Sequence, residues 1–222
     1  MHGERNLGTF CDPHPGDHSV VFFERSEDKY STLFEFVRKG LEIGDVVVYL
    51  TPLMKERRIL ELMSRYRIEA RKSVKEGRLK ILPVLVSFGG AHNPKRTITI
   101  GSLKREVTIL GRELKGRNLR IASSLPEHLQ KENKKREILR FERALLSVAR
   151  EKSVSILCGY NSRLLKRPSW FRIFPFLTTI HEKGAFISSR GSLVMDKLGS
   201  PRARSRNEHV SNRGPENENP EC

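Results

Sequence analysis

The sequence predicts an α/β domain in which one mostly parallel sheet carries helices on both faces. Two observations indicate this class. Apolar runs of strand length alternate with amphipathic helical segments over residues 18–187, and the first run, Val20 to Phe23, is unbroken rather than alternating. An unbroken apolar run is typical of a strand buried on both faces of a parallel sheet. Strands separated by helices of this length imply right-handed crossovers, so we expect three layers in a single domain.

The first unit of this alternation spans residues 18–51. A strand at about 18–24 precedes a helix at 30–40, and a second strand starts at Val46. The helix places its apolar side chains on one side and ends near Gly40, as a C-cap requires. The turn before the helix lacks the glycines with which a phosphate-binding loop forms its backbone cradle. The chain therefore starts in the order of a nucleotide-binding domain but without its phosphate site.

The remaining elements continue the alternation. The expected order is helix 54–66, strand 78–84, helix 102–115, strand 118–123, helix 126–151 and strand 153–158. The last apolar stretch, 170–187, is expected to add an edge strand at Ala185 to Ile187. Residues 1–17 predict an irregular lead-in because Gly and Pro interrupt them. Residues 188–222 predict a disordered tail, since large apolar side chains are nearly absent from about residue 196 onward.

The composition is that of a globular protein with one sizeable core. Of 222 residues, 37% are hydrophobic and 31% are charged. No apolar run approaches the ~20 residues that span a bilayer, and the N-terminus lacks the apolar region of a signal peptide. We therefore expect a cytoplasmic protein with no membrane partner. The three cysteines, Cys11, Cys158 and Cys222, are widely spaced, which favours free thiols over a disulfide framework.

The net charge of +16 is the strongest compositional signal. Residues 188–222 hold six Lys/Arg and five Asp/Glu, so +15 of this charge lies on residues 1–187. A basic surface indicates nucleic acid, an acidic partner or an anionic surface, and Trp170 with Phe171 could stack on bases. A nucleic-acid-associated regulator is therefore one alternative function. The positive charge is concentrated in four segments, Lys104 to Arg105, Lys115 to Arg120, Lys131 to Arg140 and Arg163 to Arg172.

Six segments carry a resemblance to a known family. They read His18-Ser-Val-Val-Phe-Phe-Glu24, Phe36-Val-Arg-Lys-Gly40-Leu41-Glu-Ile-Gly44-Asp45, Leu119-Arg120-Ile121, Phe141-Glu142-Arg-Ala-Leu-Leu146, Leu157-Cys158-Gly-Tyr160-Asn161 and His181. Over residues 18–187 they resemble the MEDS domain, the sensory domain named for methanogens, methylotrophs and the regulator DcmR. The resemblance implies a ligand-sensing protein with small organic molecules as ligands and transcriptional or signalling partners.

The segment around Gly40 also resembles the second strand of RecA-like, KaiC-type ATPases, which implies a RecA-like sheet. Counted from Gly40, Lys29 falls where their phosphate-loop Lys would lie. Lys29 and Ser31 could be a vestigial phosphate contact, because a helix N-terminus offers unpaired N–H groups. The alternative, which we favour, is a solvated Lys29 that pairs with Glu27 or Asp28. A degenerate nucleotide-binding ATPase is the third function considered.

The candidate ligand-binding residues lie mostly near predicted strand ends. Open α/β sheets place their ligand crevice at the carboxyl edge of the strands, so we expect a small molecule to bind there. Arg120 and Glu142 could instead form a structural ion pair, Cys158 could be a buried hydrophobe, and His181 could cap a turn. The candidates are His18, Glu24, Arg120, Ser123, Ser124, Glu142, Cys158, Tyr160, Asn161 and His181.

Metal and catalytic signals are weak. Cys11, His14 and His18 have a spacing compatible with a transition-metal site, but no second cysteine pair accompanies them. No nucleophile elbow and no triad is marked by local sequence. We therefore predict no metal, no cofactor and no enzyme activity. The expected function is a non-catalytic sensory domain that binds a small molecule at the strand-end crevice and regulates a partner protein in transcription or signal transduction.

Overall fold

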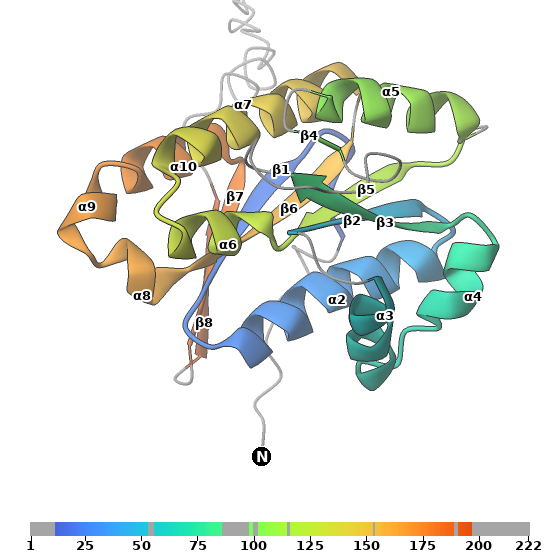
Figure 1. Cartoon of the computed structure of the whole chain (residues 1–222), viewed down its shortest axis with the longest axis horizontal. Coiled ribbons are helices and arrows are strands. Elements are labelled where there is room, and N and C mark those ends of the chain that lie inside the picture. The colour runs from blue at the N-terminus through green and yellow to red at the C-terminus, as the bar shows by residue number, and fades with distance from the viewer. Residues whose placement is uncertain are drawn as a thin grey trace, which may run out of the picture.

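The computed structural model describes residues 12–52, 56–85, 98–99, 102–114, 116–152, 154–188 and 191–196. In this part of the chain one sheet separates two layers of helices (Figure 1). The predicted class, a three-layer α/β fold with a mostly parallel sheet, is confirmed.

The sheet has eight strands within the described ranges, in the order β4-β3-β2-β5-β6-β1-β7-β8. All neighbouring strands are parallel except β7 and β8. β1 and β5 are buried along their whole length, as the unbroken apolar run Val20 to Phe23 predicts for β1. The strands are β1 (His18–Phe23), β2 (Val46–Pro52), β3 (Leu79–Leu85), β4 (Ile98–Thr99), β5 (Leu119–Ser123), β6 (Ser155–Asn161), β7 (Lys183–Ser188) and β8 (Gly191–Asp196).

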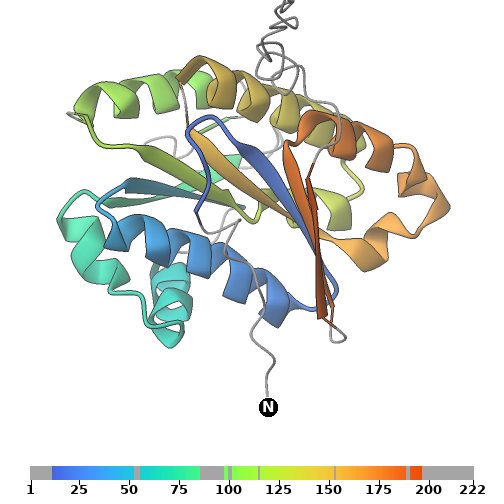
Figure 2. The same cartoon turned by 180° about the vertical axis from the view of Figure 1, so that it is seen from behind.

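The helices are α2 (Ser26–Glu42), α3 (Glu56–Arg65), α4 (Ala70–Lys75), α5 (Leu103–Glu113), α6 (Leu125–Lys131), α7 (Lys135–Lys152), α8 (Ser162–Leu165), α9 (Pro168–Phe171) and α10 (Phe174–Ile180). α2, α3 and α4 cover one face of the sheet, and α5, α6 and α7 cover the other (Figures 1 and 2). Phe34 and Tyr49 belong to the core on the α2 face, whereas Phe141 and Trp170 belong to the core on the α7 face. None of the described helices is long and apolar enough to cross a membrane.

The predicted helix 126–151 is two helices, α6 and α7. Asn133 between them has φ 55°, a left-handed conformation that Asn tolerates better than most residues. This residue interrupts the helix and lets α7 change direction, so that it runs beside α5 over the sheet (Figure 1). The sequence analysis also omitted α4, a short helix that follows α3.

Gly40 does not end its helix as predicted. α2 continues to Glu42, and the left-handed glycine beyond its end is Gly44, at φ +88°. Gly40 instead lies where another side chain packs closely, because a Cβ placed on it would be 2.8 Å from Cδ of Arg120. Position 40 therefore requires glycine because the neighbouring side chains leave no room for a Cβ atom.

The ordered chain extends beyond the predicted domain end at residue 187. Within the predicted tail 188–222, residues 191–196 form β8, which pairs with β7 in an antiparallel hairpin. β7 is therefore an interior strand rather than the predicted edge. Val194 packs against the α2-side core and the Met195 side chain contacts Gly184, so this short apolar run is long enough to add a strand. Residues 197–222 lie outside the described part. At the other end, residues 12–17 form no helix or strand.

Candidate functional site

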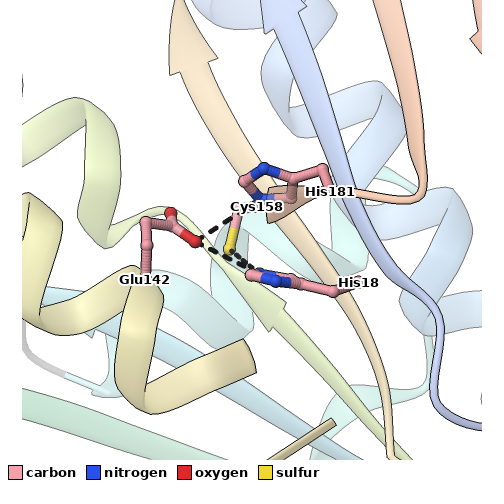
Figure 3. Close-up of side chains that lie close together, drawn as sticks. All are labelled: His18, Glu142, Cys158 and His181. Atoms are coloured by element: carbon pink, nitrogen blue, oxygen red, sulfur yellow. Dashed lines mark hydrogen bonds and ion pairs between the residues drawn. The ribbon is translucent and has the colours of Figure 1, made fainter. Parts of the chain in front are cut away.

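Four side chains from four separate elements meet beneath α7 (Figure 3). His18 begins β1, Cys158 lies in β6, Glu142 lies in α7, and His181 lies between α10 and β7. His18 and Cys158 share a face of the sheet because Val20 pairs with Cys158 and side chains alternate along a strand. All four side chains are buried. We call these residues the His–Glu–Cys cluster.

The carboxylate of Glu142 is the centre of the cluster. Its Oε2 atom lies 3.1 Å from Nε2 of His18 and 3.4 Å from Nε2 of His181. Its Oε1 atom accepts a hydrogen bond of 2.5 Å from the hydroxyl of Tyr160. The thiol of Cys158 lies 3.7 Å from Nε2 of His18. Polar atoms from three residues therefore converge on one buried carboxyl group, and the thiol of Cys158 lies beside them.

The electrostatics of the cluster favour an ionised carboxylate beside a neutral thiol and a neutral phenol. Burial acts to raise the pKa of Glu142, but the interactions with His18 and His181 outweigh it and hold that pKa far below its usual range. Burial raises the pKa of the Cys158 thiol and of the Tyr160 hydroxyl, and the charge of Glu142 raises both further. Burial lowers the pKa of His18, and nearby His181 lowers it further.

His181 is held by a backbone carbonyl on its other side. Its Nδ1 atom lies 2.7 Å from the carbonyl oxygen of Leu177 in the last turn of α10, so it donates a hydrogen bond there. This contact directs Nε2 toward Glu142. The ring also packs against that of His18, with centroids 4.1 Å apart. The alternative that His181 caps a turn therefore agrees with the structure, although its other nitrogen faces the cluster.

A pocket of about 350 Å³ opens at the carboxyl ends of β1 and β7, beside α8, α9 and α10. Its surface is mostly apolar, and the charged groups at its wall are Glu24 and Lys166, whose side chains approach to 4.0 Å. This pocket occupies the kind of place in which open α/β sheets bind ligands. We call it the strand-end pocket. It is lined by Glu24, Ser162, Leu165, Lys166, Phe171, Phe174, Phe186, Ile187 and Ser188.

Aromatic rings connect the strand-end pocket with the His–Glu–Cys cluster. Phe186 in the pocket wall stacks on Phe22, with ring centroids 4.6 Å apart. Phe22 contacts the ring of Tyr160 at 6.1 Å, and the hydroxyl of Tyr160 reaches Glu142. A movement of Phe186 would therefore displace the ring of Phe22 and, through it, the ring of Tyr160.

The structure divides the predicted ligand-binding residues among several places. Of this set, Glu24 lines the strand-end pocket, whereas the His–Glu–Cys cluster and Tyr160 lie inside the domain. Ser123 and Asn161 lie at strand ends but serve as helix caps. The Ser123 hydroxyl accepts a hydrogen bond from the backbone of Leu125, and the Asn161 side chain accepts one from the backbone of Arg163. Ser124 is the buried N-cap residue of α6.

Arg120 belongs to a different interaction from the one considered. Its guanidinium pairs with Asp45 at 2.5 Å and lies 5.3 Å from the ring centre of Phe36, beside α2. Glu142 lies in α7, on the other face of the sheet. The alternative of an Arg120–Glu142 ion pair is therefore wrong. Asp45 lies within one of the segments that resemble the family, and the sequence predicted no site role for it.

Lys29 is buried rather than solvated, with 5% of its surface exposed. Its ammonium pairs with Glu127 of α6 at 2.5 Å and lies 4.1 Å from the centre of the Tyr30 ring. The favoured pairing with Glu27 or Asp28 is therefore wrong, and Asp28 instead accepts hydrogen bonds from Arg25. Burial acts to raise the pKa of Glu127, but Lys29 and Lys131 outweigh it and keep that pKa below its ordinary value. A protein carboxylate thus satisfies the lysine that aligns with the phosphate-loop position.

Ser31 makes a local contact in the first turns of α2. Its hydroxyl donates a hydrogen bond to the backbone carbonyl of Asp28, which is an ordinary helical interaction. The N-cap residue of α2, Arg25, makes no capping hydrogen bond with its side chain.

The metal candidate near the N-terminus is not assembled within the described residues. Cys11 lies outside them, and the side chain of His14 is 83% exposed and lies 3.7 Å from Asp17. His18 points instead into the buried cluster. His14 and His18 of this spacing-based set therefore point to different places.

The aromatic wall of the strand-end pocket was not predicted from the sequence. Phe174 and Phe186 lie in the apolar stretch 170–187, which was treated only as a source of one strand. The many Phe residues in this stretch were the signal that could have indicated an apolar pocket wall. Trp170 and Phe171 could stack on bases but are a pair more often found in a core or a partner-binding patch, and Trp170 is indeed buried, whereas Phe171 is 73% exposed at the pocket wall.

A known protein family matches most of this chain. The family model of the MEDS domain, described as the "MEthanogen/methylotroph, DcmR Sensory domain", matches residues 17–172. This match spans more than half of the chain, so the protein belongs to the MEDS family, as its sequence segments suggested. The curated proteins contain no match to the chain.

Solved structures agree on the fold. The chain resembles the "ATPase Domain of G40P" with a TM-score of 0.57 at 11% identity, over 80% of this chain and 71% of that one. It also resembles uncharacterized protein PH0321 from Pyrococcus horikoshii, solved in complex with an unknown peptide, with a TM-score of 0.58 at 11% identity over 86% of each chain. At these identities the likeness concerns the fold, and the expected RecA-like architecture is confirmed.

Proposed function

We propose that this protein is a non-catalytic sensory domain that binds a small, mostly apolar molecule in the strand-end pocket and reports its presence to a partner protein. The observation that carries the proposal is the pocket itself. It lies at the carboxyl ends of parallel strands, its volume of about 350 Å³ suits a small ligand, and its wall is formed largely by Phe and aliphatic side chains. Membership of a sensory family supports the same function.

The position of Lys29 supports a sensor rather than an ATPase. A nucleotide phosphate would have to displace the carboxylate of Glu127, which lies 2.5 Å from the lysine ammonium in a buried contact. The turn before α2 and the first turn of α2 also bring the carboxylates of Glu24, Glu27 and Asp28 to the place of a phosphate cradle. Both features oppose the binding of a polyanion.

Binding would reach a partner through the short helices beside the pocket. Phe171 of α9 and Phe174 of α10 line the pocket and lie near the molecular surface, so an occupant would shift the balance between positions of these helices. Such a shift requires the ligand to bind the two arrangements with different affinity. The regulated process belongs to transcription or signal transduction in this proposal, and the domain acts in the cytoplasm.

The nucleic-acid alternative has less support from the side chains. Trp170 is buried, and several lysines of the basic segments form ion pairs, including Lys104 with Glu151 and Lys131 with Glu127. A mobility-shift titration with DNA and RNA across a salt series tests it. Binding that weakens steeply with salt would support this alternative, whereas no shift at low salt would exclude it.

A thermal-shift panel tests the proposed function. We expect one or more small apolar molecules to raise the melting temperature of the protein, and ATP with Mg²⁺ to leave it unchanged. Phe171→Ala should reduce the ligand-induced shift because its exposed ring forms part of the pocket wall. Leu193→Ala is the matched control, since Leu193 is also an exposed apolar residue, at 61%, but lies outside the pocket. Strong stabilisation by ATP with Mg²⁺ that Lys29→Ala abolishes would contradict the proposal.

A further inference from the structure

The His–Glu–Cys cluster offers four metal-binding atoms in one buried place. One ligand atom from each of His18, Glu142, Cys158 and His181 lies within 4.8 Å of the other three. We propose that this cluster is a closed tetrahedral site for a divalent transition metal of the zinc type, held by two imidazole nitrogens, one carboxylate oxygen and one thiolate. The site is distinct from the strand-end pocket and does not depend on its function.

The distances between these atoms fit tetrahedral coordination. With Zn–N of about 2.0 Å, Zn–O of about 2.1 Å and Zn–S of about 2.3 Å, a tetrahedron separates N and O ligands by about 3.4 Å and N and S ligands by about 3.6 Å. The corresponding separations are 3.1 Å and 3.4 Å from Glu142 Oε2 to the two Nε2 atoms, and 3.7 Å from Cys158 Sγ to His18 Nε2. Since all four atoms lie within 4.8 Å of one another, a metal ion at the centre would require the longer separations to shorten by up to ~1 Å.

The orientation of His181 favours a cation between it and Glu142. Nδ1 of His181 donates a hydrogen bond to the Leu177 carbonyl, so Nε2 is the ring nitrogen that remains for a metal ion. This atom and Oε2 of Glu142 lie 3.4 Å apart, and neither meets the geometry of a hydrogen bond with a described residue. A cation at the centre of the cluster would therefore contact both Nε2 of His181 and Oε2 of Glu142.

The groups around the cluster are those that usually orient metal ligands. A metal-bound histidine commonly donates its other N–H to a carbonyl oxygen, as His181 does to Leu177. A metal-bound carboxylate is commonly hydrogen-bonded through its second oxygen, as Glu142 is by Tyr160. The two contacts leave Nε2 of His181 and Oε2 of Glu142 directed into the cluster (Figure 3).

The donor set selects the class of metal. Imidazole and thiolate ligands favour zinc and similar late transition metals over Mg²⁺ or Ca²⁺, which prefer oxygen. Metal binding would release the thiol proton of Cys158, and the resulting thiolate together with the Glu142 carboxylate would neutralise a divalent ion in this buried site. Four protein ligands leave no open position, so the ion would be structural, and it would join β1, β6, α7 and the α10–β7 connection.

Metal content and cobalt spectroscopy test the site in the full chain. We expect purified protein grown with zinc to hold about one zinc per chain by elemental analysis. Replacement by Co²⁺ should give the visible bands of tetrahedral cobalt and a thiolate-to-cobalt charge-transfer band. Cys158→Ala should remove the charge-transfer band, and His181→Ala should lower the metal content. A circular dichroism spectrum of each variant shows whether it folds.

Controls separate this site from the one suggested by spacing near the N-terminus. Cys11→Ala and His14→Ala each remove a possible ligand of that other site, and neither residue belongs to the cluster. Both variants should keep the full zinc content and the cobalt spectrum. Loss of the charge-transfer band in Cys11→Ala with its retention in Cys158→Ala would overturn the proposal.

A measurement on the wild-type protein tests the proposal even if the variants fail to fold. If the wild-type chain, unfolded in a chelator and refolded with excess Zn²⁺ or Co²⁺, holds no metal and shows no thiolate-to-cobalt band, the proposal is wrong. If zinc binds, it should raise the melting temperature of the wild-type protein, and Mg²⁺ at the same concentration should not.

Discussion

Lys29 and Glu127 form a buried ion pair between the start of α2 and the start of α6, with 2.5 Å between Nζ and Oε2. The residues are 98 positions apart in sequence. Lys131 also contacts Glu127, at its other carboxylate oxygen. The pair therefore joins helices on opposite faces of the sheet, at the carboxyl ends of its parallel strands.

Lys29→Met should lower the free energy of unfolding by about 3 kcal/mol, because Glu127 then stays buried with one of its two cations removed. Chemical denaturation measures this change. Lys29→Met combined with Glu127→Gln should recover part of the loss, since the uncompensated carboxylate is gone. An equal loss in the double variant would show that the methylene chain of Lys29, rather than its charge, stabilises the fold.

The stability provided by Glu127 should depend on pH below its ordinary pKa of 4.5. The folded-state pKa lies below that value, so the ionised group stabilises the fold above pH 4.5, and this contribution is lost as the pH falls through the folded-state pKa. Denaturation of the wild type and of Glu127→Gln should therefore differ by a constant amount above about pH 5 and converge at lower pH. A difference that grows as the pH falls would contradict this assignment.

Gly40→Ala should destabilise the protein although Ala favours helices. The new Cβ would lie 2.8 Å from Cδ of Arg120 and 3.1 Å from Val47, and Arg120 cannot move freely because it is buried and paired with Asp45. We expect a loss of about 1–3 kcal/mol. Gly111→Ala in α5 is the matched control, since a Cβ there meets nothing within 4 Å, and it should stabilise by up to about 1 kcal/mol. Equal effects of the two variants in thermal and chemical denaturation would show that the Arg120 side chain moves aside to accommodate the new methyl group.

The sequence predicted the sheet well because its strands carry their own signal. β1 is buried along its length, and its unbroken apolar run Val20 to Phe23 specifies such a strand without knowledge of its neighbours. Gly40 and Asn133 were misjudged because their roles depend on context. One is fixed by the approach of Arg120, and the other by a single left-handed backbone conformation.

The site was predictable as a set of residues but not as an arrangement. His18, Glu142, Cys158 and His181 were all named, because the family resemblance marks them, and the structure brings all four together. Their partners were not foreseen, since ion pairs such as Lys29–Glu127 join residues about a hundred positions apart with no local pattern. Strand-end reasoning located the pocket edge at Glu24 but could not show that the cluster lies inside the core.

Tyr160→Phe should lower the free energy of unfolding by about 2 kcal/mol, because Oε1 of the buried Glu142 carboxylate loses the hydrogen bond from the phenol. Tyr49→Phe is the matched control. The Tyr49 hydroxyl is equally buried and lies near Ser124, but no contact with a described residue meets the full geometry of a hydrogen bond, so its removal should cost less than removal of the Tyr160 hydroxyl. Chemical denaturation of both variants at neutral pH makes the comparison. Similar losses in the two would mean that the Tyr160 ring, packed against Phe22, matters more than its hydroxyl.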